Sequence, residues 1–243
     1  MNTSVVAQAY WDESYEQLQF RITDRHDPVR QWIEQHISKT EGATCLEVGC
    51  FPGRYLAVFG QLGYELHGID LTPRISELSS WLTQSGYKTG DFTHADFLKH
   101  TSAEQYDVVC SFGFVEHFTN WREVLQKHAD MIKTGGTLIM ETPNFRGWMQ
   151  YFLHKHLDAE NFARHHIDAM QPDVWKNLLE ASGFEIKWHG HFGAFDFWSD
   201  TRHYNFLQKL GLRFLTLAKP MLKKLPEGKK SIAPYCGIVA VKR

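Results

Sequence analysis

The sequence lacks the features that mark a membrane-spanning or secreted chain. It contains no apolar run of about 18 residues, the length that a membrane-spanning helix requires. Its first residues reach Asp12 and Glu13 without the basic region and apolar stretch of a secretion signal. Internal repeats and low-complexity tracts are also missing. We therefore expect a cytoplasmic globular protein.

Cysteine is scarce, and no two cysteines stand in a Cys-x-x-Cys pair or at metal-finger spacing. The four that are present are Cys45, Cys50, Cys110 and Cys236, each in or beside a segment typical of a core strand. We expect buried thiols that pack as small hydrophobic side chains in a reducing compartment.

The chain has 243 residues, of which 43% are hydrophobic and 22% charged, as is ordinary for one α/β domain with elaborations. Its net charge of −2 is unevenly distributed. Residues 206–230 carry seven Lys or Arg against the single acid Glu227, so this segment has +6 and the remainder −8. Such asymmetry predicts a surface contact. We do not expect nucleic acid as the partner, because basic and aromatic residues do not interleave elsewhere.

Short β-rich runs alternate with helical patterns. The runs are 44–48, 65–69, 88–92, 107–111 and 137–141, and we predict a helix in each interval between them. This alternation is typical of a parallel sheet with crossover helices. After Pro143 follow a His-rich aromatic stretch, a helix at about 172–182, and strands at 184–188 and 235–241.

Two helix starts have local signals. Thr72-Pro73 predicts an N-cap followed by proline at the first helical position. Asn120 is predicted to cap a helix over 121–131, which stops at Gly135-Gly136.

Residues 45–53 predict a buried strand that ends in a glycine turn, and about twenty residues later a second strand ends at Asp70. Glycines in such a turn let the backbone approach a ligand closely. A carboxylate at Asp70 can accept hydrogen bonds from both hydroxyls of a ribose. The pattern therefore indicates a cofactor that contains adenosine.

A dinucleotide is the less suitable cofactor, because the Gly-x-Gly-x-x-Gly pattern fails at Phe51. Glu47, inside the first strand, would repel a pyrophosphate. The same carboxylate can receive an amino group, which suits the zwitterionic end of S-adenosylmethionine. A nicotinamide enzyme stays as an alternative.

The chain resembles the class I S-adenosylmethionine-dependent methyltransferases over roughly residues 40–145, in motifs that keep the family's order and spacing. The matching segments are Glu47–Gly53, Asp70, His94–Phe97, Tyr106–Phe118 and Gly135–Ile139. The resemblance implies an α/β fold: a Rossmann-like, doubly wound, seven-stranded sheet. In this family the sheet is mostly parallel with the last strand antiparallel, helices cover both faces, and cap insertions lie over the carboxyl edge.

The resemblance also implies the residues that bind S-adenosylmethionine and its product S-adenosylhomocysteine. They are Glu47, Gly49, Cys50, Gly53, Asp70, Leu71, Asp96, Phe97, Ser111, Phe112 and Glu116. In this family Asp96 takes the adenine amine, and the backbone of Ser111 and Phe112 lies near the methionine part. Phe51 departs from the family, which usually has glycine there, so its side chain has to turn away from the cofactor.

Two histidines are candidates for the base that takes the acceptor's proton. His117 follows the fourth strand in a Glu-His pair that resembles the ubiquinone-biosynthesis O-methyltransferases. His166 lies in a segment that is similar to methyltransferases of sugars and polysaccharide precursors. We expect O-methylation of a small or lipid-linked molecule, a sugar or a quinone-like ring. An N- or carboxyl-methyltransferase and a non-catalytic cofactor-binding module are the alternatives.

A group of histidines suggests a metal site, but we expect no metal. These histidines are His154, His156, His165, His166, His189 and His191. Their spacing gives His-x-His pairs without an adjoining cluster of acids.

We expect one methyltransferase domain over 1–243, with cap insertions at about 143–171 and 190–233 that shape the acceptor pocket. Within the second insertion, an apolar stripe recurs at helical spacing, in a helix that Pro220 should end near Ala218. The stripe is Leu207, Leu210, Phe214, Leu217 and Met221. Basic residues accompany it, so peripheral membrane contact through 206–230 and a cap helix with solvated lysines are both open. The oligomeric state is not indicated.

Overall fold

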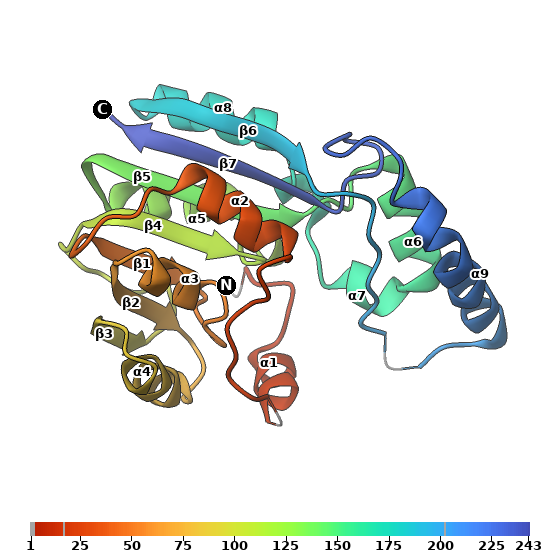
Figure 1. The fold of residues 1–243 in the computed structure, drawn as a ribbon, viewed down its shortest axis with the longest axis horizontal. Coiled ribbons are helices and arrows are strands. Elements are labelled where there is room, and N and C mark those ends of the chain that lie inside the picture. Colours follow the sequence, from red (N-terminus) through yellow and green to blue (C-terminus); the bar gives the residue numbers. More distant parts are fainter. Residues whose placement is uncertain (1–2, 17, 202) are drawn as a thin grey trace.

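The computed structural model describes residues 3–16, 18–201 and 203–243. Figure 1 shows one twisted sheet with helices on both faces and a further group of helices beyond one end of the strands. The strands are β1 (Thr44–Val48), β2 (Glu65–Asp70), β3 (Thr89–His94), β4 (Tyr106–Phe112), β5 (Ile132–Pro143), β6 (Phe184–Phe192) and β7 (Tyr235–Lys242).

The sheet has seven strands in the order β3-β2-β1-β4-β5-β7-β6. Strand β7 pairs antiparallel with β5 and β6, and the other pairs are parallel. This confirms the predicted doubly wound sheet with an antiparallel last strand. The strand order reverses between β1 and β4, which are neighbours in space although β2 and β3 lie between them in the chain.

Helices cover both faces of the sheet (Figure 1). Helices α2 (Pro28–His36), α3 (Leu56–Gln61) and α4 (Ile75–Gln84) pack on one face, and α5 (Trp121–Asp130) and α8 (Pro172–Ala181) on the other. The remaining helices are α1 (Gln8–Tyr15), α6 (Trp148–Leu157), α7 (Ala159–Ala163), α9 (Phe206–Leu222) and the 3₁₀ turns η1 (Val115–His117) and η2 (Ile167–Ala169).

Alternating side chains of the central strands build two separate cores. In β4, Val108 and Cys110 pack with α2, α3 and α4, whereas Val109 packs with α5 and α8. In β5, Ile139 joins the first core, and Leu138 joins the second. Both faces of a parallel sheet are buried, so these strands are continuous apolar runs rather than alternating ones.

Helices α6, α7 and α9 lie beyond the carboxyl ends of the parallel strands (Figure 1). They fall within the two segments where the sequence predicts cap insertions. A small separate core, formed by Phe195, Phe197, Leu215 and Ile232, holds α9 against α6.

The predicted helix between β3 and β4 is wrong, since residues 95–105 form turns and irregular structure. Lys127 of α5 donates to the carbonyls of Leu98 and His100. The Asp96 carboxylate accepts from the Leu98 N–H. These bonds engage backbone groups that a helix would have paired internally.

The predicted helix starts need two corrections. Helix α4 begins at Ile75, because the Asp70 carboxylate accepts from the Thr72 N–H and holds the chain in a turn. Helix α5 begins at Trp121 as predicted, but the Asn120 side chain caps nothing. Its amide donates to Glu123 instead.

Other predicted ends are also displaced. Helix α5 stops at Asp130, and Gly135-Gly136 lies inside β5, beside a register shift against β4. Strands β5 and β6 are longer than predicted. Strand β7 pairs with β6 over its whole length and with β5 from Thr137 to Pro143, and Ile132 at the start of β5 pairs with Tyr106 of β4. Helix α9 continues through Pro220 to Leu222. Proline so close to a helix end removes only a bond in the last turns.

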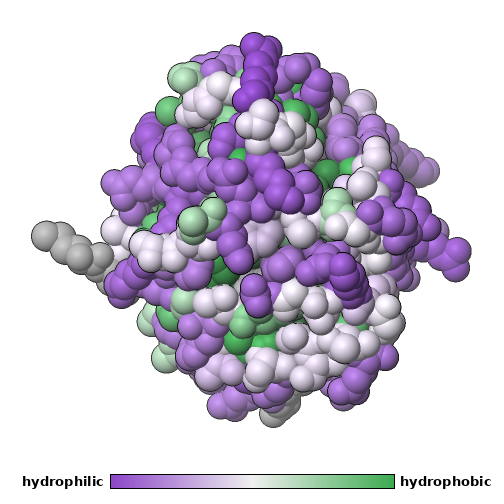
Figure 2. Space-filling model, turned by 90° about the vertical axis from the view of Figure 1, so that its left-hand side faces the viewer, coloured by the Kyte–Doolittle hydropathy of each residue, from purple (hydrophilic) through white to green (hydrophobic). Residues whose placement is uncertain are grey.

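The four cysteines are free and buried, as predicted. Among the described residues, no helix is long and apolar enough to cross a membrane. Figure 2 views the molecule from the side where the parallel strands begin, and hydrophilic residues dominate this face with scattered apolar ones.

Gly53 is a position in the turn after β1 where a side chain should be costly. Its φ is +76°, and an added Cβ would lie 2.2 Å from Cδ1 of Leu78. Gly42 has nearly the same φ, +77°, with nothing within 4 Å of its Cβ position. We predict that Gly42→Ala lowers the free energy of unfolding by about 1 kcal/mol, the cost of the left-handed backbone. Gly53→Ala should cost about 1–3 kcal/mol more, from overpacking. Urea unfolding measures both, and equal losses would contradict the packing argument.

Candidate active site

A cavity of about 1400 Å³ lies at the carboxyl ends of the parallel strands. Its walls come from the ends of β1, β2, β4 and β5, from α1, and from the segments after α7 and before α9. Open α/β sheets bind ligands where the strand order reverses, as it does here between β1 and β4. The structure therefore brings the predicted motifs to one place.

The predicted cofactor-binding residues line this cavity, with one exception. The lining residues among them are Glu47, Gly49, Cys50, Gly53, Asp70, Leu71, Asp96, Phe97, Phe112 and Glu116. Ser111 is buried behind the wall, and its hydroxyl has no hydrogen-bond partner among the described residues. Only its backbone is implicated by the resemblance, so the buried hydroxyl has no predicted role.

The turn after β1 can exist only with glycine at its first position. Gly49 has a φ of +68°, and an added Cβ would lie 2.4 Å from Cδ2 of Phe114. The Gly49 N–H donates to the carbonyl of Ile69 at the end of β2. The turn thereby stays close to the neighbouring strand, and its backbone is available to a ligand.

Phe51, the departure from the family pattern, packs against the N-terminal part of the chain. Its ring centroid lies 4.7 Å from that of Tyr15 and 5.5 Å from that of Phe20. The Arg74 guanidinium lies over the ring. Phe51 is buried, and these three partners occupy its side chain while the residue still contributes to the cavity wall.

Asp70 joins the two turns that form this part of the cavity. Its carboxylate accepts from the Phe51 N–H at 3.0 Å and from the Thr72 N–H at 2.9 Å. Burial raises the pKa of Asp70, and these N–H donors oppose the rise. A carboxylate has about four lone-pair sites, so acceptor capacity is left for a ligand hydroxyl.

Asp96 and Phe97, which the resemblance assigns to cofactor binding, follow β3. Phe97 is buried and its ring packs against Phe114 and His128. One oxygen of Asp96 accepts from the Leu98 N–H, and the other lies 3.0 Å from the exposed Lys99 ammonium. Because Lys99 is exposed, breaking its ion pair with Asp96 costs little free energy.

Three glutamates are buried beside the cavity. Glu47 and Glu141 are each 4% exposed, and Glu116 is fully buried. One oxygen of Glu47 and both oxygens of Glu116 have no hydrogen-bond partner among the described residues. Burial raises the pKa of Glu141 to about 8, and it raises the pKa of Glu47 and Glu116 well above their usual range. A cationic ligand stabilises the ionised form of such buried carboxyl groups, so these glutamates favour its binding.

His117 and His165 come from different segments and meet at the cavity wall, with ring centroids 4.8 Å apart. His117 Nδ1 donates to the Arg164 carbonyl at 2.9 Å, and His165 Nδ1 donates to the Asn161 carbonyl at 2.7 Å. A carbonyl only accepts, so each Nδ1 carries the proton and each Nε2 is the unprotonated nitrogen of its ring. Burial lowers the pKa of His117 to about 4 and that of His165 well below its usual range, so both rings are neutral at pH 7.

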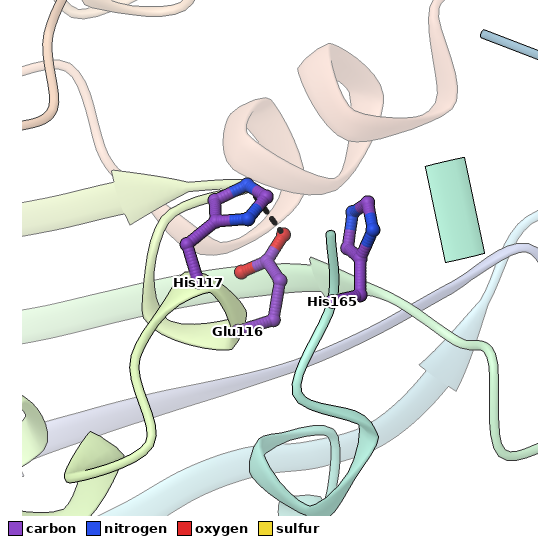
Figure 3. A group of neighbouring side chains, drawn as sticks. All are labelled: Glu116, His117 and His165. Carbon is purple, nitrogen blue, oxygen red and sulfur yellow. Dashed lines mark ion pairs between the residues drawn. The ribbon is translucent and has the colours of Figure 1, made fainter. Parts of the chain in front are cut away.

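Figure 3 shows the two rings on either side of Glu116. His117 Nε2 lies 4.0 Å from Glu116 Oε1. Ligand atoms of these three residues lie within 4.8 Å of one another, so this cluster is where the described chain could hold a divalent ion. The other histidines named in the sequence analysis lie outside the cluster. His154, for example, is buried and paired with Asp158.

His166, the second predicted base, is not among the described residues that line the cavity. Its backbone N–H donates to the Glu116 carbonyl, and its neighbour His165 takes the place at the wall. The wall formed by α1 and by the start of β7 was not predicted from the sequence. It contributes Tyr10, Trp11, Tyr15 and Tyr235, whereas Arg164 and Trp198 lie in the predicted cap insertions. The close aromatic spacing in residues 10–15 was the available signal.

The family model described as "Methyltransferase domain" matches residues 21–187. The chain belongs to this family, and with its fold it is a class I S-adenosylmethionine-dependent methyltransferase. It is similar to a ubiquinone biosynthesis O-methyltransferase of Leptothrix cholodnii, with 30% identity over 145 residues that make up 58% of this chain. The match spans 60% of the length of that relative.

Solved structures share the fold. A SAM dependent methyltransferase from Archaeoglobus fulgidus superimposes with a TM-score of 0.56 and 20% identity, over 88% of this chain and 93% of that one. The N-methyltransferase NodS from Bradyrhizobium japonicum, in complex with S-adenosyl-L-homocysteine, gives 0.54 and 12% identity, over 87% and 84%.

The residues at the cavity fit S-adenosylmethionine. The unpartnered oxygen of Glu47 can accept from the ligand's ammonium group, and Asp70 has acceptor capacity left for the ribose hydroxyls. When bound, this cofactor supplies a methyl group on a positively charged sulfur. Several buried carboxylates beside one cavity are well suited to a ligand with two positive charges.

Replacing Asp70 should weaken binding of the cofactor. We predict that Asp70→Ala weakens binding of S-adenosylhomocysteine by about 1–3 kcal/mol, because a charged acceptor is lost from a buried site. Asp70→Asn, which keeps one acceptor oxygen, should lose less. Asp91→Asn changes an exposed acid on β3, outside this cavity, and serves as the control. Isothermal calorimetry gives the affinities, and an unchanged affinity in Asp70→Ala would place the ribose elsewhere.

Cofactor binding should release protons at neutral pH. The free protein keeps a proton on Glu141 up to pH of about 8, and a cationic ligand favours the ionised form. Affinity for S-adenosylmethionine, which carries a sulfonium as well as an ammonium group, should therefore rise with pH up to about 8, by at most tenfold per pH unit for each proton released. Calorimetry in buffers of different ionisation enthalpy counts the protons. Glu141→Gln should release fewer protons, and a pH-independent affinity in the native protein would contradict the pKa assignment.

Proposed function

We propose that the protein transfers a methyl group from S-adenosylmethionine to a hydroxyl oxygen of a small acceptor with a quinone-like ring. The observation that carries the proposal is His117, a neutral imidazole at the cavity wall whose Nδ1–H is fixed by the Arg164 carbonyl. The similarity to a ubiquinone biosynthesis O-methyltransferase supports the acceptor class.

The chain's part in the reaction is to align the acceptor and receive its proton. The acceptor oxygen forms the new bond to the methyl carbon as the carbon–sulfur bond breaks, with the oxygen and sulfur in line. The hydroxyl proton passes to His117 Nε2, which is the unprotonated nitrogen of that ring. Glu116, 4.0 Å away, would then stabilise the imidazolium.

Aromatic side chains make the walls around His117 suitable for a flat ring. The Trp11 ring centroid lies 5.1 Å from that of His117. Trp198 and Tyr235, which also line the cavity, stack on each other. Aromatic faces also accept the faces of sugars, so a sugar hydroxyl is the second acceptor class that we propose. Nitrogen or carboxyl methylation, and a binding module without turnover, are the alternatives that the assay below separates.

We also propose that the acceptor is free or lipid-linked, and that residues 206–230 bring the protein into peripheral contact with a membrane. The +6 charge of this segment and the exposed apolar side chains of α9 support that contact. The surface is analysed in the next subsection.

His117→Ala should lower turnover about 10²–10⁴-fold, the usual contribution of a general base, with S-adenosylhomocysteine affinity within about twofold of the native protein. The assay follows S-adenosylhomocysteine release with a panel of catechols as acceptors. His166→Ala is the matched control, since that neighbouring histidine does not line the cavity.

Equal activity of His117→Ala and native protein would remove His117 as the base. Loss of turnover in His166→Ala alone would move the base to His166. Tight binding of S-adenosylhomocysteine without turnover on catechols, sugars, amines or carboxylates would identify a binding module.

A further inference from the structure

Helix α9 has two apolar faces, and only one of them is covered. The inner face carries Leu212, Leu215 and Leu222, which belong to the small core of the cap. Gly211 brings α9 close to α6, since a Cβ there would lie 2.7 Å from Cδ2 of Leu157. The helix is therefore firmly seated by its inner face and by the capping box at Asn205.

The outer face is the stripe found in the sequence, and it is exposed. Its exposed fractions range from 56% at Leu210 to 82% at Leu217. The exposed members are Phe206, Leu207, Leu210, Phe214, Leu217 and Met221. At 100° per residue the stripe spans about a quarter of the helix circumference along its whole length. On the neighbouring helix α6, Trp148 and Phe152 are 66% and 56% exposed. A contiguous apolar face of this size indicates a partner.

The charges around the stripe specify the partner. Residues 206–226 contain no Asp or Glu, and Lys209, Arg213, Lys223 and Lys224 are exposed beside the apolar side chains. Lys219, on the inner side, is paired with Asp196. A row of cations along an apolar stripe is complementary to anionic headgroups over acyl chains.

A second copy of the chain fits this face less well. Two such stripes in contact would bring their basic rows together, and residues 206–226 offer no acid to pair with them. The rest of the molecule carries −8, so an anionic surface would repel its other faces and select α9. The opposite side of the protein, in Figure 2, is dominated by hydrophilic residues.

We propose that the outer face of α9 docks on a bilayer with anionic headgroups, with the helix lying in the plane of the interface. Its 17 residues extend about 25 Å along the surface. Binding is peripheral, since the inner face of the helix stays packed on the cap.

Docking would place the cavity beside the membrane. Trp198 and Asp200, in the segment that leads into α9, line the cavity, and α6 is followed by the segment of Arg164 and His165. An acceptor with a lipid tail could then reach the site from the bilayer. Delivery of the acceptor from the bilayer rests on the proposed function, whereas the docking of α9 on the membrane does not.

Vesicle co-sedimentation of the full chain tests the docking. Phosphatidylcholine vesicles with phosphatidylglycerol should bind the protein, and phosphatidylcholine alone should bind it weakly. The triple variant Leu210→Gln, Phe214→Gln, Leu217→Gln should bind about a hundredfold more weakly or worse, through lost apolar contact. Replacing Lys209, Arg213 and Lys224 by Gln should cost about fivefold for each charge and reduce the salt dependence.

Thr216→Gln, an exposed change on the same helix but outside the stripe, should bind vesicles as the native protein does. All variants should keep the native affinity for S-adenosylhomocysteine, which shows that they fold. Equal sedimentation of the triple variant, or no binding of native protein to anionic vesicles, would overturn the docking surface. A native dimer in sedimentation velocity that the triple variant abolishes would assign the stripe to a second copy instead. Because cofactor binding and turnover are measured separately, failure of docking would remove the membrane contact and leave the proposed methyl transfer intact.

Discussion

The burial of Glu47, Glu116 and Glu141 beside one cavity is the constraint on which the site depends. Burial of carboxylates is costly, and it raises the pKa of all three, although the Arg54 guanidinium opposes that rise for Glu47 and Glu141. Both oxygens of Glu116 and one of Glu47 have no hydrogen-bond partner among the described residues. The parallel sheet produces this state, because all its carboxyl ends meet at one edge. A ligand that carries an ammonium and a sulfonium group resolves the imbalance, which links the electrostatics of the fold to the choice of cofactor.

The sheet and the surrounding helices have different tasks in this molecule. The carboxyl ends of the parallel strands hold the residues that fit the cofactor. The two hydrophobic cores on the faces of the sheet fix the positions of these strands. The other side of the cavity, where we propose that the acceptor binds, is formed by α1, the segment after α7 and the segment before α9. The cap helices have a small core of their own. His117 lies where the two parts meet, because its ring follows β4 while its Nδ1 is held by the Arg164 carbonyl.

The sheet, its cofactor motifs and the fully apolar strands could be predicted because local pattern determines them. The position of the cap insertions could be predicted as well, but the packing within the cap could not, since its contacts join distant segments. His165 rather than His166 faces the cavity because a backbone bond from His166 to Glu116 sets the rotation of that segment. The stripe on α9 was visible in the sequence, but its exposure follows from Gly211 and Leu215, which turn the other face inward. Periodicity reveals an apolar face without revealing what covers it.

A crystal structure of the protein with S-adenosylhomocysteine would show whether Asp70 and Glu47 hold the cofactor. We expect the ribose hydroxyls within hydrogen-bond distance of Asp70 and the ammonium group on the side of Glu47. His117 Nε2 should line the space beyond the sulfur. A ligand bound away from the carboxyl ends of β1 and β2, or a nucleotide whose diphosphate occupies the glycine turn, would contradict this expectation.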